Sequence, residues 1–558
     1  MNLSRAGVKK GIPPMGFREL KSRYHKLKTG LRGANLAGPF ALAASVRRFL
    51  SEPITLERAK EGLRAAVADR EDRFLGLVRA RVYARPSSPF LKLLRWCGCD
   101  YAELEHQVRR YGLEATLERL AAEGVYLTAD EAKGKKEVVR GNESFRVDPR
   151  SLENTELSAN YFSQSSGTSN RPTRSAVSLD RLAIWALIGS VFYAAHDLFS
   201  CSHAVYDAAL PAGGGLRNLL INAKLGIATD RWFARSVGQM TLGGRYYHFM
   251  TRLIVLAGKS ASAGPGLPMP EFISVGDTGR IVDWVRNETR RAKRCCITTA
   301  ASNAVRIARV AAETAVSLEG TTFLASGEPL TPTKRELIER VGAVVIPMYG
   351  FEDLAVRVGY GCPRPAHTDE MHVNWQGLAV VAHSRALADG SDIRPLLFTS
   401  LQPLSPRFFL NVENGDYAAL SQRDCGCLLE NAGFTLHIHG VRSFEKFTSE
   451  GMNYFYGDLF ELFEKTLPAE FGGGPGDYQL IEEEDAGGQT RLTLLLHPAV
   501  DGVDEAKLIA RLKEALRSGA SGGRFMTDIW QNAGTLRVLR EPPRASARGK
   551  ILPLHITR

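Results

Sequence analysis

The sequence predicts an α/β protein with a large N-terminal domain of helix-flanked sheets and a small α+β C-terminal domain. A chain of 558 residues is too long for a single hydrophobic core, so two or three domains are expected. A strand–helix–strand unit can be recognised between Thr321 and Met348, and strands alternate with helices again after residue 442. The apolar content of 44% and charged content of 24% are typical of a soluble globular protein.

Residues 1–75 are expected to form a basic, helical N-terminal extension. The first 50 residues hold eleven Lys and Arg against Glu19 alone, which gives them +10 of the chain's net charge of +12. Such an arm could contact an acidic partner, nucleic acid or an anionic membrane, or it could be a solvated helix. Because no other basic surface interleaved with aromatic residues is evident, nucleic acid is not expected to be the main ligand.

The region that follows is expected to be helical. Between residues 55 and 125, apolar residues such as Leu63 and Val67 recur at intervals of three or four. Asp180 is expected to cap another helix. The apolar run 182–199 contains His196 and Asp197 and is shorter than the roughly 20 apolar residues that span a bilayer, so a buried helix is expected. No secretory signal is evident, and eight cysteines in so long a chain indicate reduced thiols and a cytoplasmic protein.

The strand–helix–strand unit predicts two parallel strands. Thr321–Ala325 is the first strand, Thr331 caps a helix that ends before Gly342, and Val344–Met348 is the second strand. Ligands of such sheets bind beyond the carboxyl ends of the strands. The polar segments at those ends suit a nucleotide pocket, and they are Ser326-Gly327-Glu328-Pro329 and Tyr349-Gly350-Phe351-Glu352-Asp353.

The C-terminal part has its own pattern of elements. A helix is expected at Asp458–Thr466, then a glycine-rich loop, strands at Tyr478–Glu482 and Leu492–His497, a helix at Glu505–Arg517 and a strand near Leu536–Leu539. This order predicts a small α+β domain.

A loop at residues 165–174 is typical of phosphate binding. Hydroxyl side chains surround Gly167, and Arg171 and Arg174 follow them. Hydroxyls and free backbone N–H groups donate to phosphate oxygens, and guanidinium groups neutralise their charge. Surface turns also use these residue types, so the loop is weak evidence when taken alone.

In order, these segments resemble the adenylate-forming superfamily of acyl-CoA synthetases, adenylation domains and luciferases, and most closely its phenylacetate-CoA ligase-like enzymes. The phosphate loop of those enzymes is S-S-G-T-T-G-K-P-T, and Ser165–Thr173 follows it with Asn170 for glycine and Arg171 for lysine. The other motifs follow in the family's order, at Ser326–Thr331 (G-G-E-P-L-T), Tyr349–Asp353 (Y-G-x-[ST]-E), Asn414–Asp416 (T-G-D), Arg442–Phe455 (the hinge segment) and Arg544–Lys550 (P-R-x-x-x-G-K).

The resemblance implies a domain arrangement and a set of site residues. The large domain would span 76–442 with a distorted β-barrel part and the ATP and acid sites, and a mobile lid at 443–558 would carry the catalytic Lys550. Tyr349 would stack on adenine, Asp416 would bind the ribose, and Arg442 would bridge ribose and phosphate. Thr168 and Asp353 would join Lys550 in catalysis, with Mg²⁺ on Asp353 or Glu352. The other nucleotide-binding residues would be Ser165, Ser166, Gly167, Ser169, Arg171, Ser326, Gly327, Glu328, Pro329 and Gly350.

Two short-spaced pairs, Cys362 with His367 and Cys425 with Cys427, indicate a structural zinc site. Thiolate and imidazole pairs at such spacing suit tetrahedral zinc, and the resembled subfamily often has cysteine and histidine at corresponding places. His372 competes with His367 as the histidine ligand, and free buried cysteines are the alternative.

The function implied by the resemblance is ATP-dependent activation of a carboxylic acid as acyl-AMP, followed by transfer to a thiol, by default CoA. Phe444 replaces the first hinge aspartate, and Val412-Glu413 replaces the Y-R that usually precedes T-G-D. The hinge change and the basic arm favour an alternative in which an amine or a carrier-protein thiol accepts the acyl group. A non-catalytic, nucleotide-binding member of the fold is the alternative from another class.

Overall fold

The computed structural model describes residues 39–164, 174–210, 212–235, 242–259, 266–274, 277–351, 354, 356–386, 392–444, 446–449, 452–455, 462–474, 476–518, 536–544 and 554–556. The basic segment 1–38 lies outside these residues. Among them, no helix combines the length and the apolar character needed to cross a membrane.

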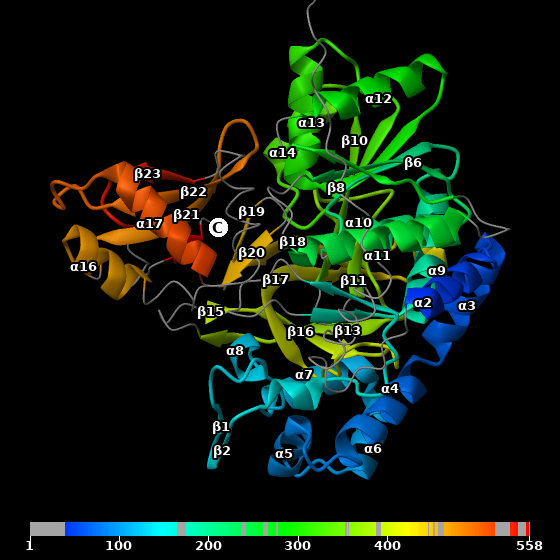
Figure 1. Cartoon of the computed structure of the whole chain (residues 1–558). Helices are drawn as coiled ribbons and strands as arrows, with labels where there is room; N and C mark the ends of the chain where they lie inside the picture. Colours follow the sequence, from blue (N-terminus) through cyan, green and yellow to red (C-terminus); the bar gives the residue numbers. More distant parts are fainter. Residues whose placement is uncertain are drawn as a thin grey trace, which may run out of the picture.

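A twelve-stranded mixed sheet organises the large part of the chain, in the order β13-β16-β17-β18-β12-β11-β10-β9-β8-β5-β6-β7 (Figure 1). Its parallel half consists of β5 (Ser202–Tyr206), β6 (Thr229–Arg235), β7 (Pro270–Ile273), β8 (Cys295–Ala300), β9 (Thr321–Ser326) and β10 (Val344–Phe351). Its antiparallel half consists of β11 (Val356–Gly361), β12 (Met371–Val373), β13 (Leu378–Ala382), β16 (Pro395–Ser400), β17 (Val412–Gln422) and β18 (Leu436–Ser443). Strand β10 belongs to both halves, and the predicted α/β class is confirmed.

Helices cover both faces of the parallel half, because its strands are apolar on alternate sides. Ile297, Phe323 and Val345 pack in the core with α12 (Gly279–Arg290), α13 (Ala301–Glu313) and α14 (Pro332–Glu339). The intervening Leu324 and Ile346 pack on the other face with α3 (Leu56–Ala68) and α9 (Leu179–Ala195). The predicted strand–helix–strand unit is therefore confirmed as β9–α14–β10, with parallel register.

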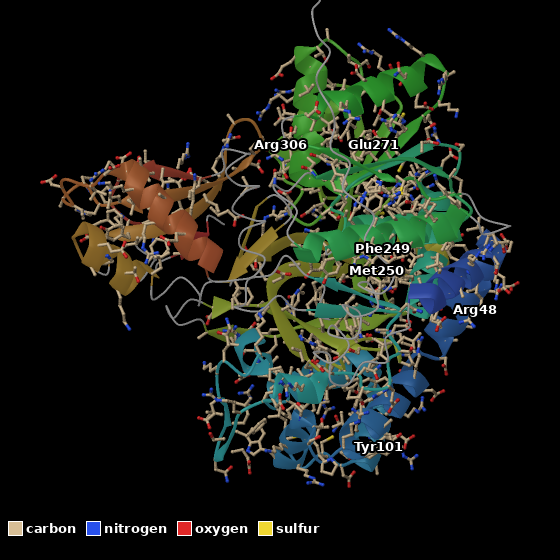
Figure 2. The ribbon with its side chains drawn as sticks, viewed as in Figure 1. Arg48, Tyr101, Phe249, Met250, Glu271 and Arg306 are labelled. Carbon is tan, nitrogen blue, oxygen red and sulfur yellow. The ribbon has the colours of Figure 1, made fainter. Side chains whose placement is uncertain are left out.

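The predicted helical region at 55–125 is confirmed, and its helices pack on the sheet. Helices α4 (Arg70–Val78), α5 (Pro89–Trp96), α6 (Tyr101–Tyr111) and α7 (Leu113–Ala122) share a core with the antiparallel half. Before them, α2 (Pro39–Leu50) packs with α10 (Gly214–Lys224) and α11 (Leu242–Lys259). Met250 of α11 is buried in that core, whereas Arg48 of α2 lies on the outer surface (Figure 2).

The prediction that Asp180 caps α9 is wrong by two residues. The helix begins at Leu179, and Ser178 is the N-cap with an extended backbone. The Leu179 N–H donates to Asn160 Oδ1 at 2.9 Å, so a residue distant in sequence satisfies the first helical donor. Asp180 lies in the first turn, where its negative charge interacts favourably with the positive end of the helix dipole.

The C-terminal elements have a hydrophobic core of their own. A four-stranded sheet in the order β23-β22-β21-β24 packs with α16 (Leu467–Phe471) and α17 (Glu505–Ser518), and Figure 1 shows these elements in orange and red beside the large sheet. The strands are β21 (Tyr478–Glu484), β22 (Thr490–Leu496), β23 (Leu536–Leu539) and β24 (Leu554–Ile556). In the helix expected at 458–466, the described part is a π-turn at Leu462–Thr466 that leads into α16.

The turn between β21 and β22 docks onto α13 and α14. Arg309 donates to the Gly487 carbonyl at 3.2 Å, and the Thr331 hydroxyl donates to the Glu484 carboxylate at 2.7 Å. Figure 2 labels Arg306 on the side of α13 that faces these C-terminal strands. Lys334 Nζ donates to Thr490 Oγ1 at 3.3 Å and also pairs with Glu328 at 3.2 Å. The C-terminal part is thus anchored next to the loop that follows β9.

Candidate active site

The carboxyl end of β10 brings together residues from the two halves of the sheet. Tyr349 donates its hydroxyl to Asp416 Oδ2 at 2.7 Å, and Asn414 Nδ2 donates to the Tyr349 hydroxyl and to Asp416 Oδ2, each at 2.8 Å. Burial, followed by the Asp416 carboxylate, raises the pKa of Tyr349 well above its ordinary value. The phenol therefore remains protonated and holds Asp416 as a hydrogen-bond acceptor.

Arg442 lies on the strand next to Asp416. In the β17–β18 register, Tyr417 pairs with Arg442 and Asp416 pairs with Ser443. Arg442 Nη1 is 3.4 Å from the Asp369 carboxylate and donates to the Val441 carbonyl at 2.8 Å. The structure thus brings Tyr349 and Asp416 into contact, and it places Arg442 on the strand paired with that of Asp416, with its guanidinium beside Asp369.

The two departures from the family's motifs are linked through Arg385. Its guanidinium forms a bidentate ion pair with Glu413, with both N–O distances at 2.7 Å, and the Glu413 side chain is 1% exposed. The same guanidinium lies 5.5 Å from the centre of the Phe444 ring, and the Phe444 N–H donates to the Gly415 carbonyl at 3.0 Å. The negative charge of Glu413 is therefore neutralised by Arg385, and Phe444, at the expected hinge position, packs against the same Arg385 guanidinium.

The segment Ser326-Gly327-Glu328-Pro329 follows β9, with Gly327 at a φ of +85° that favours glycine. Glu328 is fully buried, and it accepts hydrogen bonds from the Ser302 hydroxyl and from the Ser302 N–H at 3.1 Å. Burial alone would raise its pKa, but Lys334 and Ser302 hold the pKa of Glu328 below its ordinary value. Glu328 thus holds the shape of this loop through Ser302 and Lys334, and its expected role in nucleotide binding stays a prediction.

A buried cluster of cysteine and histidine side chains lies where β11, β12, β17 and β18 end or begin. One ligand atom each from Cys362, His372, Cys425 and His437 lies within 4.8 Å of all the others. The sulfur of Cys427 is 3.2 Å from His372 Nε2, and that of Cys425 is 3.6 Å from the same nitrogen. A hydrogen bond from Cys362, and then one from His372, lowers the pKa of Cys427 to about 3.

The hydrogen bonds around this cluster orient its atoms toward a common centre. His372 Nδ1 contacts the Phe434 carbonyl at 2.6 Å, which orients the ring so that Nε2 faces the sulfurs. His437 Nε2 is buried and forms no hydrogen bond in the described part of the chain. Arg423 Nη2 lies 3.7 Å from the Cys362 sulfur, where it favours thiolate charge.

The structure does not place the expected ligand His367 in this cluster. The ring of His367 stacks on that of His439, with 3.7 Å between the ring centres. The competing His372 is the histidine beside the cysteines, because β12 pairs with β18 and sets His372 opposite His437. His372 therefore takes the place of His367 as the candidate histidine ligand.

Several expected site residues lie outside the described residues. They are the phosphate loop with Ser165, Ser166, Gly167, Thr168, Ser169 and Arg171, the carboxylates Glu352 and Asp353, and Lys550. Their assigned roles remain predictions.

Comparison with solved structures finds proteins of similar fold. Crystalline 2-hydroxyisobutyryl-CoA ligase, in complex with its acyl-AMP and CoA in the thioesterification state, has a TM-score of 0.52 and 16% identity over 88% of this chain and 90% of its own. The chain has the fold of an acyl-CoA ligase. A double mutant of o-succinylbenzoate CoA synthetase from Bacillus subtilis is more distant, with a TM-score of 0.38 and 13% identity over 71% of this chain and 68% of its own. No protein-family model matches the sequence, and no curated protein matches it.

In this acyl-CoA ligase fold, the structure adds residues that the sequence analysis did not single out. Asn414 is the first residue of the Asn414–Asp416 motif, and its amide binds both Tyr349 and Asp416. His437 belongs to the segment Leu436-His437-Ile438-His439, in which apolar side chains alternate with histidines, as is typical of a strand. The pairing of that strand with β12 was the missing information, since it joins residues about 65 positions apart.

Proposed function

We propose that this protein is an ATP-dependent ligase that activates a carboxylic acid as an acyl-adenylate and transfers the acyl group to a thiol, by default CoA. The observation that carries the proposal is the hydrogen-bonded group of Tyr349, Asn414 and Asp416 at the strand where the two halves of the sheet join. The aromatic ring of Tyr349 suits stacking on a nucleobase, and the buried carboxylate of Asp416 suits hydrogen bonds from the hydroxyls of a ribose. The closer relationship to phenylacetate-CoA ligase-like enzymes is part of the proposal and rests on the sequence motifs.

In the proposed reaction, an oxygen of the acid attacks the α-phosphorus of ATP and pyrophosphate leaves. Most of the protein's contribution is positioning and charge neutralisation. Tyr349 would stack on adenine, Asp416 would accept hydrogen bonds from the ribose, and Arg442 would approach the phosphate. The loop at 165–171 would hold the pyrophosphate, and Lys550 would bring a mobile positive charge to the reacting carboxylate. Mg²⁺ would bind at Asp353 or Glu352.

The Cys and His cluster fits a structural zinc ion. Two ring nitrogens and three sulfurs are buried together, and His437 Nε2, which lies 3.8 Å from the Glu370 carboxylate, makes no hydrogen bond within the described residues. Cys362, Cys425, Cys427 and His372 would hold the metal in a tetrahedral Cys₃His set, with His437 as the competing imidazole. Bound zinc would tie β11 and β12 to the segment after β17.

A second candidate function differs only in the acceptor. The Phe444 ring packs against Arg385 at the hinge position, and the basic segment 1–38 could steer an acidic carrier protein. These observations favour an amine or a carrier-protein thiol in place of CoA. A non-catalytic nucleotide-binding role is the alternative from another class.

The test is acid-dependent exchange of pyrophosphate into ATP, measured with the wild type and Lys550→Ala over aryl, fatty, amino and dicarboxylic acids. Exchange with some acids that collapses in the variant would support adenylation. Absence of exchange with every acid, in protein shown to bind ATP, would support the non-catalytic alternative. Product analysis with CoA, amines and a carrier protein then identifies the acceptor.

A further inference from the structure

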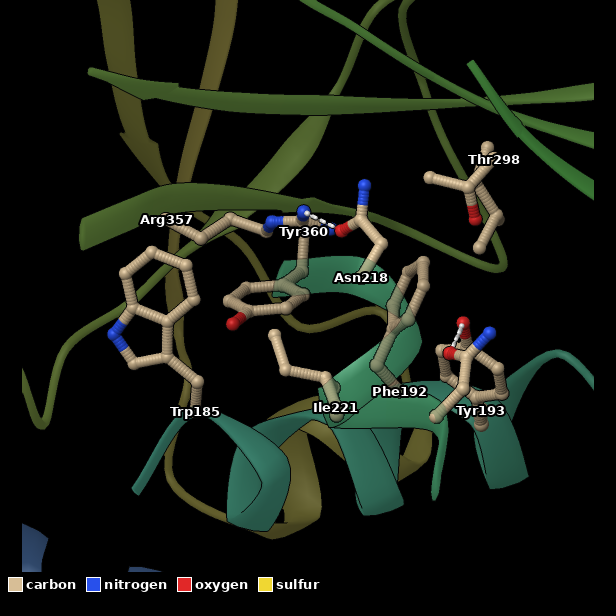
Figure 3. Close-up of a pocket in the computed structure, with 11 residues that line it drawn as sticks. Trp185, Phe192, Tyr193, Asn218, Ile221, Thr298, Arg357 and Tyr360 are labelled. Atoms are coloured by element: carbon tan, nitrogen blue, oxygen red, sulfur yellow. Dashed lines mark hydrogen bonds between the residues drawn. The ribbon is translucent and has the colours of Figure 1, made fainter. Parts of the chain in front are cut away.

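A cavity lies between the sheet and helices α9 and α10 (Figure 3). Its walls come from α9 with Trp185 and Phe192, from α10 with Asn218 and Ile221, and from β11 with Arg357 and Tyr360. Thr298 of β8 and Leu324 of β9 also line it, so it lies beside the strands whose carboxyl ends form the candidate active site. About 370 Å³ of space lies between its atoms when its solvent-filled opening is included.

A β-bulge directs Arg357 into this cavity. Tyr349 pairs with Gly359, but the next residue of β10, Gly350, pairs with Arg357, so one extra residue of β11 lies between the two pairs. The bulge shifts the alternation of side chains and places Arg357 on the same face as Tyr360. Its partner Gly350 has no side chain to cover it. The cavity therefore lies on one face of β10 and β11, and the side chain of Tyr349, which is proposed to bind adenine, lies on the opposite face.

Arg357 has no carboxylate partner among the described residues. Its side chain contacts Asn218 Oδ1 at 3.5 Å, the sulfur of Met348 and the ring of Tyr360, whose centre lies 5.8 Å from the guanidinium carbon. Burial is the main cause that lowers the pKa of Arg357; Tyr360 opposes this effect and the charge of Arg217 adds to it. A buried guanidinium of this kind is stabilised best by an anion that accepts two parallel hydrogen bonds from it, as a carboxylate does.

Two other polar side chains of the cavity, Tyr193 and Asn222, are already hydrogen-bonded. Tyr193 donates to Asn222 Oδ1 at 2.9 Å, and Asn222 Nδ2 donates to Thr229 at 3.1 Å. Asn218 lies next to the guanidinium in Figure 3 and accepts a hydrogen bond from it through Oδ1. Trp185, Phe192 and Ile221 supply apolar wall. The cavity thus offers a short apolar passage with one cationic, hydrogen-bonding end.

We propose that this cavity receives the acyl part of the acid and that Arg357, with Asn218, binds a second carboxylate, so that the substrate is a short dicarboxylic acid. The inference rests on the proposed function, because it assigns the acid of the same adenylation reaction. One carboxylate displaces pyrophosphate from ATP, and the other keeps its charge in the ion pair with Arg357. The acid is short because the space between the atoms of the cavity, with its solvent-filled opening included, is only about 370 Å³.

The experiment compares diacids with monoacids of equal chain length in acid-dependent ATP–pyrophosphate exchange, using succinate against butyrate and glutarate against pentanoate. The wild type should show a KM for the diacid roughly 10- to 100-fold lower than for the monoacid, as one charged hydrogen-bonded contact would give. Arg357→Met keeps the bulk of the side chain and removes its charge, so it should abolish or reverse that preference while monoacid exchange persists. Arg286→Met makes the same change on the exposed face of α12, where the side chain is 44% exposed, and should leave the preference unchanged.

The shift of the thermal unfolding midpoint by each acid, measured without ATP, gives a readout that does not need turnover. A diacid should stabilise the wild type and not Arg357→Met. A wild type that prefers monoacids, or an Arg357→Met variant that loses monoacid and diacid exchange equally, would overturn the inference and leave the proposed function standing. No exchange with any acid, together with no diacid-induced thermal shift, would overturn both.

Discussion

Replacing Tyr349 with phenylalanine tests the adenosine site at the level of a single oxygen atom. The change removes the hydroxyl that donates to Asp416 at 2.7 Å and accepts from Asn414 at 2.8 Å. It keeps the aromatic ring, so stacking on adenine is preserved. It also keeps the Asn414–Asp416 hydrogen bond at 2.8 Å, so the carboxylate is not left without a donor.

The expected effect follows from the one contact that is lost. A hydrogen bond to a charged group contributes roughly 1.5–3 kcal/mol, and a loss of about 2 kcal/mol corresponds to about 30-fold. Asp416 loses a donor that orients it toward the ribose, so the KM for ATP should rise about 30-fold with little change in the KM for the acid. The assay is pyrophosphate exchange titrated separately with ATP and with acid.

Tyr478→Phe is the matched control. Tyr478 is also a buried tyrosine, and its hydroxyl donates to the Gly472 carbonyl at 2.7 Å within the C-terminal core. Its loss should lower the unfolding midpoint and leave the KM for ATP unchanged. A Tyr349→Phe enzyme with a normal KM for ATP, or with a raised KM for the acid alone, would refute the assignment of this group to the nucleotide.

Three further predictions concern the metal cluster and the hinge. His372→Ala should lose one equivalent of zinc by elemental analysis, whereas His367→Ala should retain it; zinc in both variants, or in neither, would contradict the ligand assignment. Arg385→Ala leaves the buried Glu413 unpaired and should destabilise the fold by about 3–5 kcal/mol in denaturant unfolding at pH 8. Burial already raises the pKa of Glu413, so protonation should relieve this penalty as the pH falls toward 5; an equal penalty at both pH values would count against the pair. Phe444→Asp places a carboxylate beside the same guanidinium and should change thiol-transfer turnover more than pyrophosphate exchange; unchanged thiol transfer would show that the hinge departure has no consequence.

Local features of the fold could be predicted because they depend on residues close in sequence. Thr331 and Pro332 start α14 where expected, through a cap and a fixed φ, whereas the helix ends at Glu339, two residues before the expected Val341. The cap of α9 was misplaced because Ser178 and Asp180 are both good capping residues. The choice between them depends on Asn160, which reaches the helix from another element.

The candidate site could be predicted only where a motif holds its residues. Tyr349 and Asp416 were expected together, and they form a hydrogen bond. Spacing favoured His367 over His372, whereas strand pairing brings His372 to the cysteines. Arg357 carries no motif, and its orientation depends on a bulge that only the register of β10 and β11 reveals.

The docked turn between β21 and β22 has a consequence for how the two parts of the chain respond to salt. It covers Lys334, whose side chain is 2% exposed, and it places the Glu484 carboxylate at the N-terminus of α14. Ions of the solvent screen exposed charge pairs strongly and buried ones weakly. The docked arrangement should therefore persist at ionic strengths that would dissociate two domains joined by surface arginines alone.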